Sequence, residues 1–301
     1  MKLSAFLCSY GPMYDQGATT FEVIDQAASQ GFGAVEPFPC ADLDTVDDAR
    51  RVGGYAREKG LEVSCFSTCC ELLGPDSHET AELMRRRIDM AAAMGSPLFH
   101  HTIHPPLTLP RRGGLRFAEA LEAALPLVRG LCEYAAERNV LCVYEDQGMY
   151  FNGCDHFGRF TEALDGTPFG VVADLGNILF VDELPEEFVG RFSDKIVHVH
   201  MKDYLRKPGG GPCPGAGWYV TRRGDYLRDT VTGHGVVNFP AVFRLLDQIG
   251  YSGWFSLEYA AMEPISFGIG MAVDNMRRYQ ADIQRNPVQL PLLDSISPRF
   301  E

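Results

Sequence analysis

The chain lacks features that mark several other classes of protein. No apolar run approaches the roughly 18 residues of a membrane span, and the short run at 3–8 is interrupted at once by Tyr10-Gly11-Pro12, too early for a secretion signal. The nine cysteines include no pair of Cys-x-x-Cys units spaced for zinc, so most are expected to be reduced and buried. We therefore expect a soluble, cytoplasmic protein.

Positive charge is also scarce. The 301 residues contain 27 Lys and Arg against 40 Asp and Glu, which leaves a formal net charge of −13. Such a field repels phosphate backbones at long range and opposes polybasic docking to a membrane. We therefore expect a small-molecule partner and neither a nucleic-acid nor a membrane partner, although a local arginine cluster can still bind a small anion.

The pattern of short elements predicts the fold. No glycine-rich GxGxxG turn follows the first predicted strand, where an open nucleotide-binding sheet usually carries one. Eight β-type runs instead alternate with eight stretches of helical periodicity. The strands are expected at 3–8, 33–36, 61–66, 97–101, 140–145, 170–174, 195–200 and 254–258. The alternation requires parallel strands covered on both faces, and their number favours a (β/α)8 TIM barrel, a single domain over residues 1–285.

Two segments depart from this regular spacing. The connection between the seventh strand and the seventh helix is unusually long and rich in Gly and Pro. We interpret residues 204–234 as a lid-like insertion, with Trp218 as a substrate contact, and a flexible surface loop as the alternative. Residues 286–301 are expected to form a carboxyl-terminal arm, which would pack on a partner subunit in a homo-oligomer.

Ionisable residues end most of the predicted strands. In a TIM barrel the carboxyl ends of the strands meet at the mouth, where active sites form. Six of the seven assigned ends are ionisable, and the full set is Glu36, Phe66, His101, Glu145, Asp174, His200 and Glu258. Charges this close repel strongly, by roughly 4 kcal/mol per pair at 4 Å and an effective dielectric near 20. The pattern therefore indicates that protons or a cation neutralise the mouth.

The densest group predicts a metal site. Glu145, Asp174, His200 and Glu258 end the fifth to eighth strands and supply three carboxylates and one imidazole. This ligand set suits one divalent cation, with Mn²⁺ favoured and Mg²⁺ or Co²⁺ as alternatives, better than structural zinc. Taken singly, each residue has a plainer explanation: a rim salt bridge for Glu145, a helix cap for Asp174 and a core hydrogen bond for His200. Lys202 is expected beside His200 as a substrate contact.

Five ordered segments resemble the xylose-isomerase-like barrels of the sugar phosphate isomerase/epimerase superfamily, which includes ketose 3-epimerases, hydroxypyruvate isomerases and inosose dehydratases. The segments are Val143–Glu145, Asp174–Asn177, His198–Asp203, Gly233–Pro240 and Gly250–Glu258. The resemblance implies that the metal is held by the four residues named above. Two positions depart from the ketose 3-epimerases: Asn177 stands where they carry His, and Phe151 where they carry a second Glu.

The chemistry expected of such a site is proton abstraction next to a carbonyl. A cation on the ketone oxygen would stabilise an enediolate, and Glu145 and Glu258 would act as acid and base in a sugar isomerase or epimerase. The main alternative is a metal-dependent lyase, either of the inosose dehydratase type or one that cleaves an oxidised glycoside by elimination. A non-catalytic sugar-binding subunit and a DNA phosphodiesterase are weaker ones. Further substrate contacts are expected from His101, Asn177 and Arg206, with His101 facing the mouth and His100 facing the helices.

Overall fold

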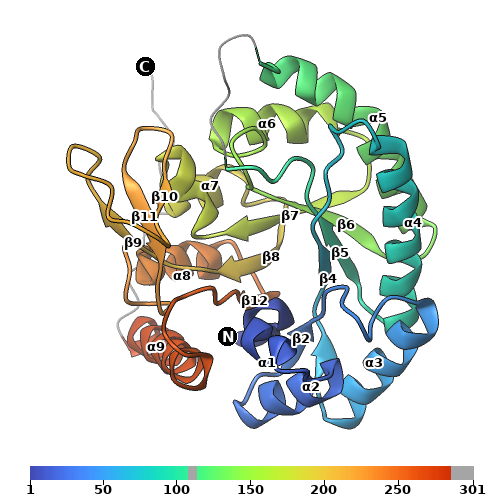
Figure 1. The fold of residues 1–301 in the computed structure, drawn as a ribbon, viewed down its shortest axis with the longest axis horizontal. Helices are drawn as coiled ribbons and strands as arrows, with labels where there is room; N and C mark the ends of the chain where they lie inside the picture. Colours follow the sequence, from blue (N-terminus) through green and yellow to red (C-terminus); the bar gives the residue numbers. More distant parts are fainter. Residues whose placement is uncertain (108–113, 286–301) are drawn as a thin grey trace, which may run out of the picture.

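A parallel barrel forms the centre of the computed structural model, which describes residues 1–107 and 114–285 (Figure 1). Nine strands hydrogen-bond in the order β3-β2-β1-β12-β8-β7-β6-β5-β4, and all pairs are parallel. The strands are β1 (Lys2–Phe6), β2 (Ala34–Glu36), β3 (Glu62–Val63), β4 (Phe66–Thr68), β5 (Leu98–His101), β6 (Leu141–Glu145), β7 (Phe169–Asp174), β8 (Ile196–Met201) and β12 (Trp254–Leu257).

The third barrel strand is interrupted, which explains why nine strands occupy eight positions. Its first part, β3, pairs with β2, and its second part, β4, pairs with β5. Between the two parts the Ser64 N–H donates to the Val35 carbonyl at 2.9 Å, and within β4 the Ser67 N–H donates to the Pro37 carbonyl, just after β2, at 3.0 Å. These bonds continue the ladder across the break and close the ring. The predicted (β/α)8 TIM barrel is therefore confirmed.

Helices surround this barrel (Figure 1). They are α1 (Gly11–Asp15), α2 (Thr20–Ser29), α3 (Val46–Glu58), α4 (Ser77–Met94), α5 (Phe117–Ala136), α6 (Cys154–Ala163), α7 (Pro185–Arg191), α8 (Phe239–Gln248) and α9 (Ile265–Arg285), with single 3₁₀ turns at η1 (Leu7–Tyr10) and η2 (Asn177–Val181). Capping boxes start two of them, in which Thr19 pairs with Glu22 and Thr45 with Asp48. Within the described chain, no helix combines the length and the apolar character that crossing a bilayer requires.

Helices α3 and α4 approach closely at a glycine, and this contact yields a stability prediction. A Cβ atom at Gly53 would lie 2.1 Å from the Met94 carbonyl oxygen, whereas one at Gly54 would meet nothing within 4 Å. We expect Gly53→Ala to lower the free energy of unfolding by about 1–3 kcal/mol, because the backbone must move apart. Gly54→Ala should raise it by about 0.5–1 kcal/mol. Urea unfolding of both variants checks this, and equal effects would contradict the close approach.

The insertion at residues 204–234 has secondary structure of its own, which differs from the flexible surface loop considered as the alternative. It contains β9 (Tyr204–Lys207), β10 (Tyr219–Val220) and β11 (Tyr226–Asp229), in an antiparallel sheet of order β10-β11-β9 that stands beside the barrel (Figure 1). Strands of two to four residues are too short to register as a periodic pattern. The carboxyl-terminal arm expected at 286–301 lies outside the described residues.

Asp203 joins the two ends of the insertion. Its Oδ2 accepts hydrogen bonds from the backbone N–H groups of Gly233 and Gly235, at 2.9 and 2.7 Å. Its Oδ1 accepts from those of Tyr204 and Val237, at 2.9 and 3.1 Å. A single buried carboxylate therefore closes the base of the insertion.

Removing this carboxylate should loosen the insertion more than the barrel. We expect Asp203→Ala to cost about 2 kcal/mol or more, because several buried N–H groups lose their acceptor. Amide hydrogen exchange should quicken at residues 233–237 before it changes in the barrel strands. Asp194→Ala serves as the control, since that side chain is 71% exposed and, among the residues that the structure describes, forms an ion pair only with Lys195. Unchanged exchange at residues 233–237 would show that other contacts hold the insertion.

Candidate metal centre and active site

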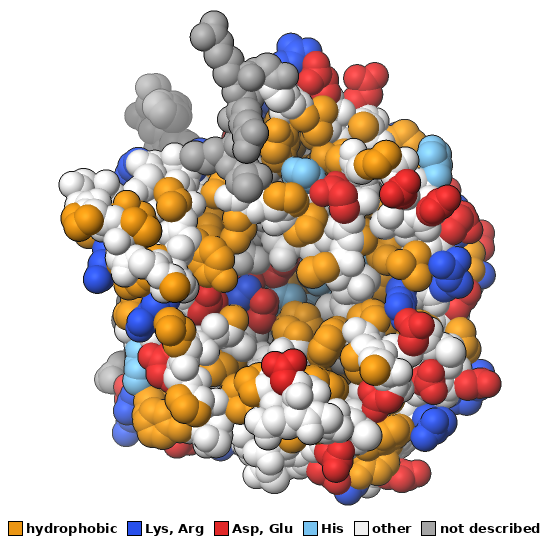
Figure 2. Space-filling view, in the orientation of Figure 1, with side chains coloured by type: hydrophobic (Ala, Val, Ile, Leu, Met, Phe, Trp, Pro, Cys, Tyr) orange, Lys and Arg blue, Asp and Glu red, His pale blue; other side chains and the backbone are white. Residues whose placement is uncertain are grey.

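The four predicted metal ligands come together at the carboxyl ends of the barrel strands. One ligand atom from each of Glu145, Asp174, His200 and Glu258 lies within 4.8 Å of the others. His200 Nδ1 is 2.7 Å from Glu145 Oε1 and 3.6 Å from Glu258 Oε2. Figure 2 shows acidic, basic and histidine side chains at the floor of the central hollow. The strands place these groups because β12, β8, β7 and β6 are consecutive around the barrel.

A cavity of about 350 Å³ opens onto this cluster. Its polar lining includes Glu145, His200 and Glu258, together with residues from the ends of β4 and β5 and from the turn after β6. The remaining lining residues are Phe6, Cys8, Phe38, Pro39, Ser67, Thr68, Cys69, His100 and Gln147. The cavity therefore has a charged wall and an apolar wall, as expected of a site that binds a small organic molecule with a few convergent polar groups.

The pKa values of Asp174 and Glu145 are shifted in opposite directions. Burial raises the pKa of the Asp174 carboxyl well above its ordinary value, and Lys202 opposes this only in part. Burial acts in the same direction on Glu145, but the charge and hydrogen bond of His200 outweigh it and lower the pKa to about 2. Lys202 forms an ion pair with Glu258 and lies 3.8 Å from Asp174 Oδ2. Without a cation, the site depends on His200 and Lys202 for neutralisation.

Asp174 carries the most direct sign of a missing partner. Its Oδ1 accepts from the N–H groups of Gly176 and Asn177, at 2.7 and 2.8 Å, and its own N–H donates to Asp146 Oδ1 at 2.9 Å. Its Oδ2 is buried and has no hydrogen-bond partner among the described residues. A buried unpaired oxygen inside a set of hard donors suits a divalent cation. The residues present therefore fit the metal that the sequence predicted.

The two neighbouring histidines of β5, His100 and His101, face the opposite sides of the strand from those predicted. His100 lines the cavity and has Nε2 3.7 Å from Glu145 Oε2. His101 instead points away from the metal cluster, with Nε2 at 3.1 Å from the Tyr144 hydroxyl and Nδ1 at 3.0 Å from the Thr102 carbonyl. Successive side chains of a strand face opposite sides, so the expectation that His101 faces the mouth is wrong by one residue.

Four other predicted substrate contacts lie outside the cavity lining: Asn177, Lys202, Arg206 and Trp218. Lys202 instead pairs with Glu258 at the edge of the cluster. Arg206 is held within the insertion by Asp182 and Asp225, at 2.7 and 2.6 Å. Trp218 lies between two cations of the same sheet, the Nζ of Lys207 and the guanidinium of Arg228, at 4.9 and 5.6 Å from its ring centre. Asn177 is buried beside Asp174, with its Nδ2 unpartnered in the described chain. The structure thus gives Arg206 and Trp218 partners in the insertion.

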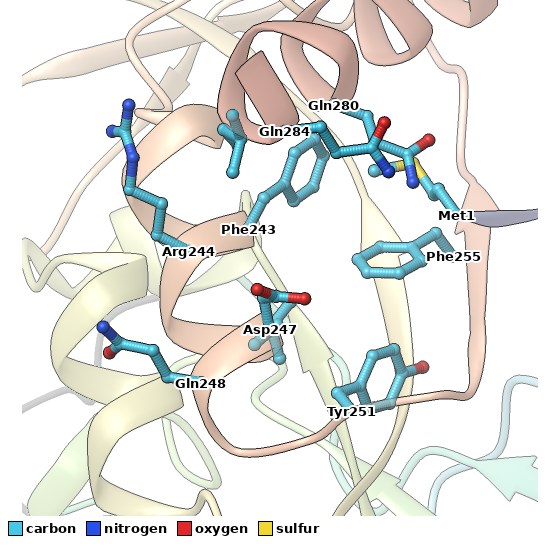
Figure 3. A pocket seen from close by; sticks show the side chains of 11 residues that line it. Met1, Phe243, Arg244, Asp247, Gln248, Tyr251, Phe255, Gln280 and Gln284 are labelled. Carbon is cyan, nitrogen blue, oxygen red and sulfur yellow. The ribbon is translucent and has the colours of Figure 1, made fainter. Parts of the chain in front are cut away.

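A second cavity lies away from this cluster. It measures about 240 Å³ and is lined by residues of α8, of α9 and of β12 with its preceding turn, among them Phe243, Tyr251, Phe255 and Gln280 (Figure 3). Met1 also lines it, which places it at the end of the barrel where the strands begin. Its charged members are Arg244 and Asp247 on one helix, and it contains none of the predicted site residues. It therefore does not compete with the mouth as the candidate active site.

Fold and site together define a TIM-barrel protein with a candidate divalent-metal centre at its mouth. The chain belongs to the xylose isomerase-like TIM barrel family, whose sequence model matches residues 24–284. The resemblance inferred from the five sequence segments is thereby confirmed.

Known relatives include both epimerases and dehydratases. An inosose dehydratase from Geobacillus thermodenitrificans is 24% identical over 214 residues, which cover 66% of this chain and 70% of that protein. A putative L-ribulose-5-phosphate 3-epimerase from Escherichia coli is 29% identical over 154 residues, which cover 50% of this chain and 47% of that protein. A solved xylose isomerase-like TIM barrel protein from Mycobacterium smegmatis, in complex with magnesium, is 19% identical with a TM-score of 0.66 over 89% of this chain and 90% of that chain.

Proposed function

We propose that this protein is a divalent-metal-dependent sugar isomerase or epimerase that removes a proton next to the carbonyl of a ketose or related keto-polyol. The observation that carries the proposal is the convergence of Glu145, Asp174, His200 and Glu258 within 4.8 Å. When bound there, a divalent cation, with Mn²⁺ favoured, would polarise the substrate carbonyl and stabilise the resulting enediolate. The magnesium complex of the M. smegmatis protein supports a hard cation.

Two carboxylates are available for the proton transfers. Glu145 ends β6 and Glu258 directly follows β12, and two strands, β7 and β8, separate β6 from β12 in the barrel. Both carboxylates line the same cavity, so a substrate bound there can contact each of them. One removes the proton, and the other returns it to the opposite face or to the adjacent carbon. His100, with both ring nitrogens unpartnered in the described chain, is positioned to bind a substrate hydroxyl.

Elimination of water is the second candidate, and Lys202 is the residue that favours it. Its ammonium pairs with Glu258, so a proton donor stands beside the proposed base. Burial lowers the pKa of Lys202, but Glu258 and the other nearby acidic groups outweigh this and raise it well above its ordinary value. The ammonium would therefore stabilise a departing hydroxyl as a charged hydrogen-bond donor. Phe151, where the ketose 3-epimerases carry a second Glu, is 2% exposed and packs against Phe117 and Phe160. An apolar contact therefore stands at the position where the ketose 3-epimerases have a carboxylate.

Product analysis in D₂O tests the proposal and separates the two candidates. The purified chain is incubated with Mn²⁺ and a panel of ketoses, ketose phosphates and inososes. An isomerase or epimerase conserves the mass of the substrate apart from an incorporated deuteron, whereas a dehydratase releases one water. Turnover should stop with EDTA and return with Mn²⁺. Turnover that is unaffected by metal removal, or no turnover of any compound in this panel, would contradict the proposed function.

A further inference from the structure

Glu36 lies next to the proposed metal site and is assigned no role by the chemistry above. It ends β2, it is fully buried, and its carboxylate accepts hydrogen bonds from two imidazoles of β8. His198 Nε2 is 2.9 Å from Glu36 Oε2, and His200 Nε2 is 3.0 Å from Glu36 Oε1. The Ser67 hydroxyl also donates to Oε1. Three donors therefore hold this carboxylate in one orientation.

The two nitrogens of His200 face different groups. Nε2 faces Glu36, and Nδ1 faces Glu145 and Glu258. A neutral imidazole carries one proton, and a carboxylate can only accept at the nitrogen that it touches. Without a cation, Glu145 calls for a proton on Nδ1 in the same way, at 2.7 Å. With a cation at Nδ1, Glu36 keeps the single proton of the neutral ring on Nε2 and leaves the lone pair of Nδ1 directed into the cluster. The opposite tautomer would place an N–H in the cluster and an unsatisfied nitrogen against a buried carboxylate.

We propose that Glu36 is a positioning residue, which fixes the ring orientation and the Nε2–H tautomer of His200 so that Nδ1 can bind the cation. This inference rests on the proposed metal site. His198 contributes indirectly, because its bond to Oε2 keeps the Glu36 carboxylate in the plane that His200 needs. Outer carboxylates of this kind also raise the basicity of the histidine ligand, and their loss typically weakens metal binding by about 10–100-fold.

The first test is Mn²⁺ binding to Glu36→Gln by titration calorimetry. Glutamine keeps the volume but loses the charge, and it has one acceptor oxygen for two imidazole N–H groups. We expect Mn²⁺ to bind about 10–100-fold more weakly. The matched control is Ser4→Ala, which breaks the buried 2.7 Å hydrogen bond to Ser64 inside the same barrel. It should lose some stability and bind Mn²⁺ as the wild type does.

The second test uses the unmodified chain and so decides the proposal even where Glu36→Gln fails to fold. Nitrogen-15 NMR of the Mg²⁺-loaded protein should show His200 with its proton on Nε2. Equal Mn²⁺ affinity of wild type and Glu36→Gln would overturn the positioning role and leave the metal site standing. A proton on Nδ1 would overturn the positioning role and also remove His200 from the ligand set, because a protonated nitrogen cannot bind the cation. Failure of the wild type to bind Mn²⁺ would overturn both the positioning role and the proposed function.

Discussion

Glu258→Gln is expected to fold like the wild type and to lose turnover by about 10³-fold at saturating Mn²⁺, within the range that a positioned acid or base contributes. Glutamine keeps the shape of the side chain, but it cannot take up a proton from carbon. It also removes the charge that pairs with Lys202. The kcat of the variant on the substrate found by product analysis, measured at several Mn²⁺ concentrations, separates lost proton transfer from weakened metal binding.

Glu263→Gln provides the control for this variant. Glu263 lies five residues further along the chain, its side chain is 34% exposed, and its ion-pair partner, Arg228, is 4.0 Å away. Its replacement should leave kcat unchanged. Retained turnover in Glu258→Gln at saturating metal would remove Glu258 from the proton transfers and leave Glu145 as the candidate base. Circular dichroism of both variants verifies that the barrel is intact.

The barrel and the four-residue cluster were predictable from the sequence because their signals are local. Each strand and helix leaves its own periodic pattern, and a residue at a strand end can be recognised from a few neighbours. Each of the four residues, Glu145, Asp174, His200 and Glu258, lies within one residue of the carboxyl end of a strand, and the parallel barrel brings such ends to one mouth. Grouping these four residues required no knowledge of how the helices pack on the barrel.

Two kinds of feature were not predictable in the same way. One depends on contacts between residues far apart in the sequence, and the other on which of two successive strand residues faces inward. Glu36 and His200 are separated by 164 positions in the sequence, so nothing local connects the carboxylate with the imidazole that it orients. The inward face of β5 depends on barrel register, and a shift of one residue exchanged the roles expected for His100 and His101. Arg206 resembled an anion-binding residue, but its partners in the structure are Asp182, directly after η2, and Asp225 in the insertion.

Asp174→Asn is expected to make the metal-free protein more stable while weakening Mn²⁺ binding by more than about 100-fold, beyond the loss typical of an outer carboxylate. Burial raises the pKa of the Asp174 carboxyl well above its ordinary value because the ionised form loses its hydration inside the protein. Asparagine keeps Oδ1 as the acceptor for the Gly176 and Asn177 N–H groups. It removes a group that the folded protein can keep only by holding its proton or by burying its charge, so we expect a gain of about 1 kcal/mol or more near neutral pH.

The pH dependence identifies the origin of this gain. With a raised pKa, folded Asp174 retains a proton that the unfolded chain releases above the ordinary carboxyl pKa of about 4. This group therefore makes the metal-free wild type less stable as pH rises from that value to the raised pKa, and the loss persists above it. The advantage of Asp174→Asn should be smaller at about pH 5 than at about pH 8.

Urea unfolding in EDTA across this range, with the exposed Asp194→Asn as control, measures the stability difference. Calorimetric titration with Mn²⁺ measures the binding that the substitution removes. A variant less stable than the wild type at every pH would mean that the Asp174 charge is already neutralised by Lys202 without a cation. A variant that gains stability and loses Mn²⁺ would show that the fold tolerates a destabilising buried charge because the cation requires it as a ligand.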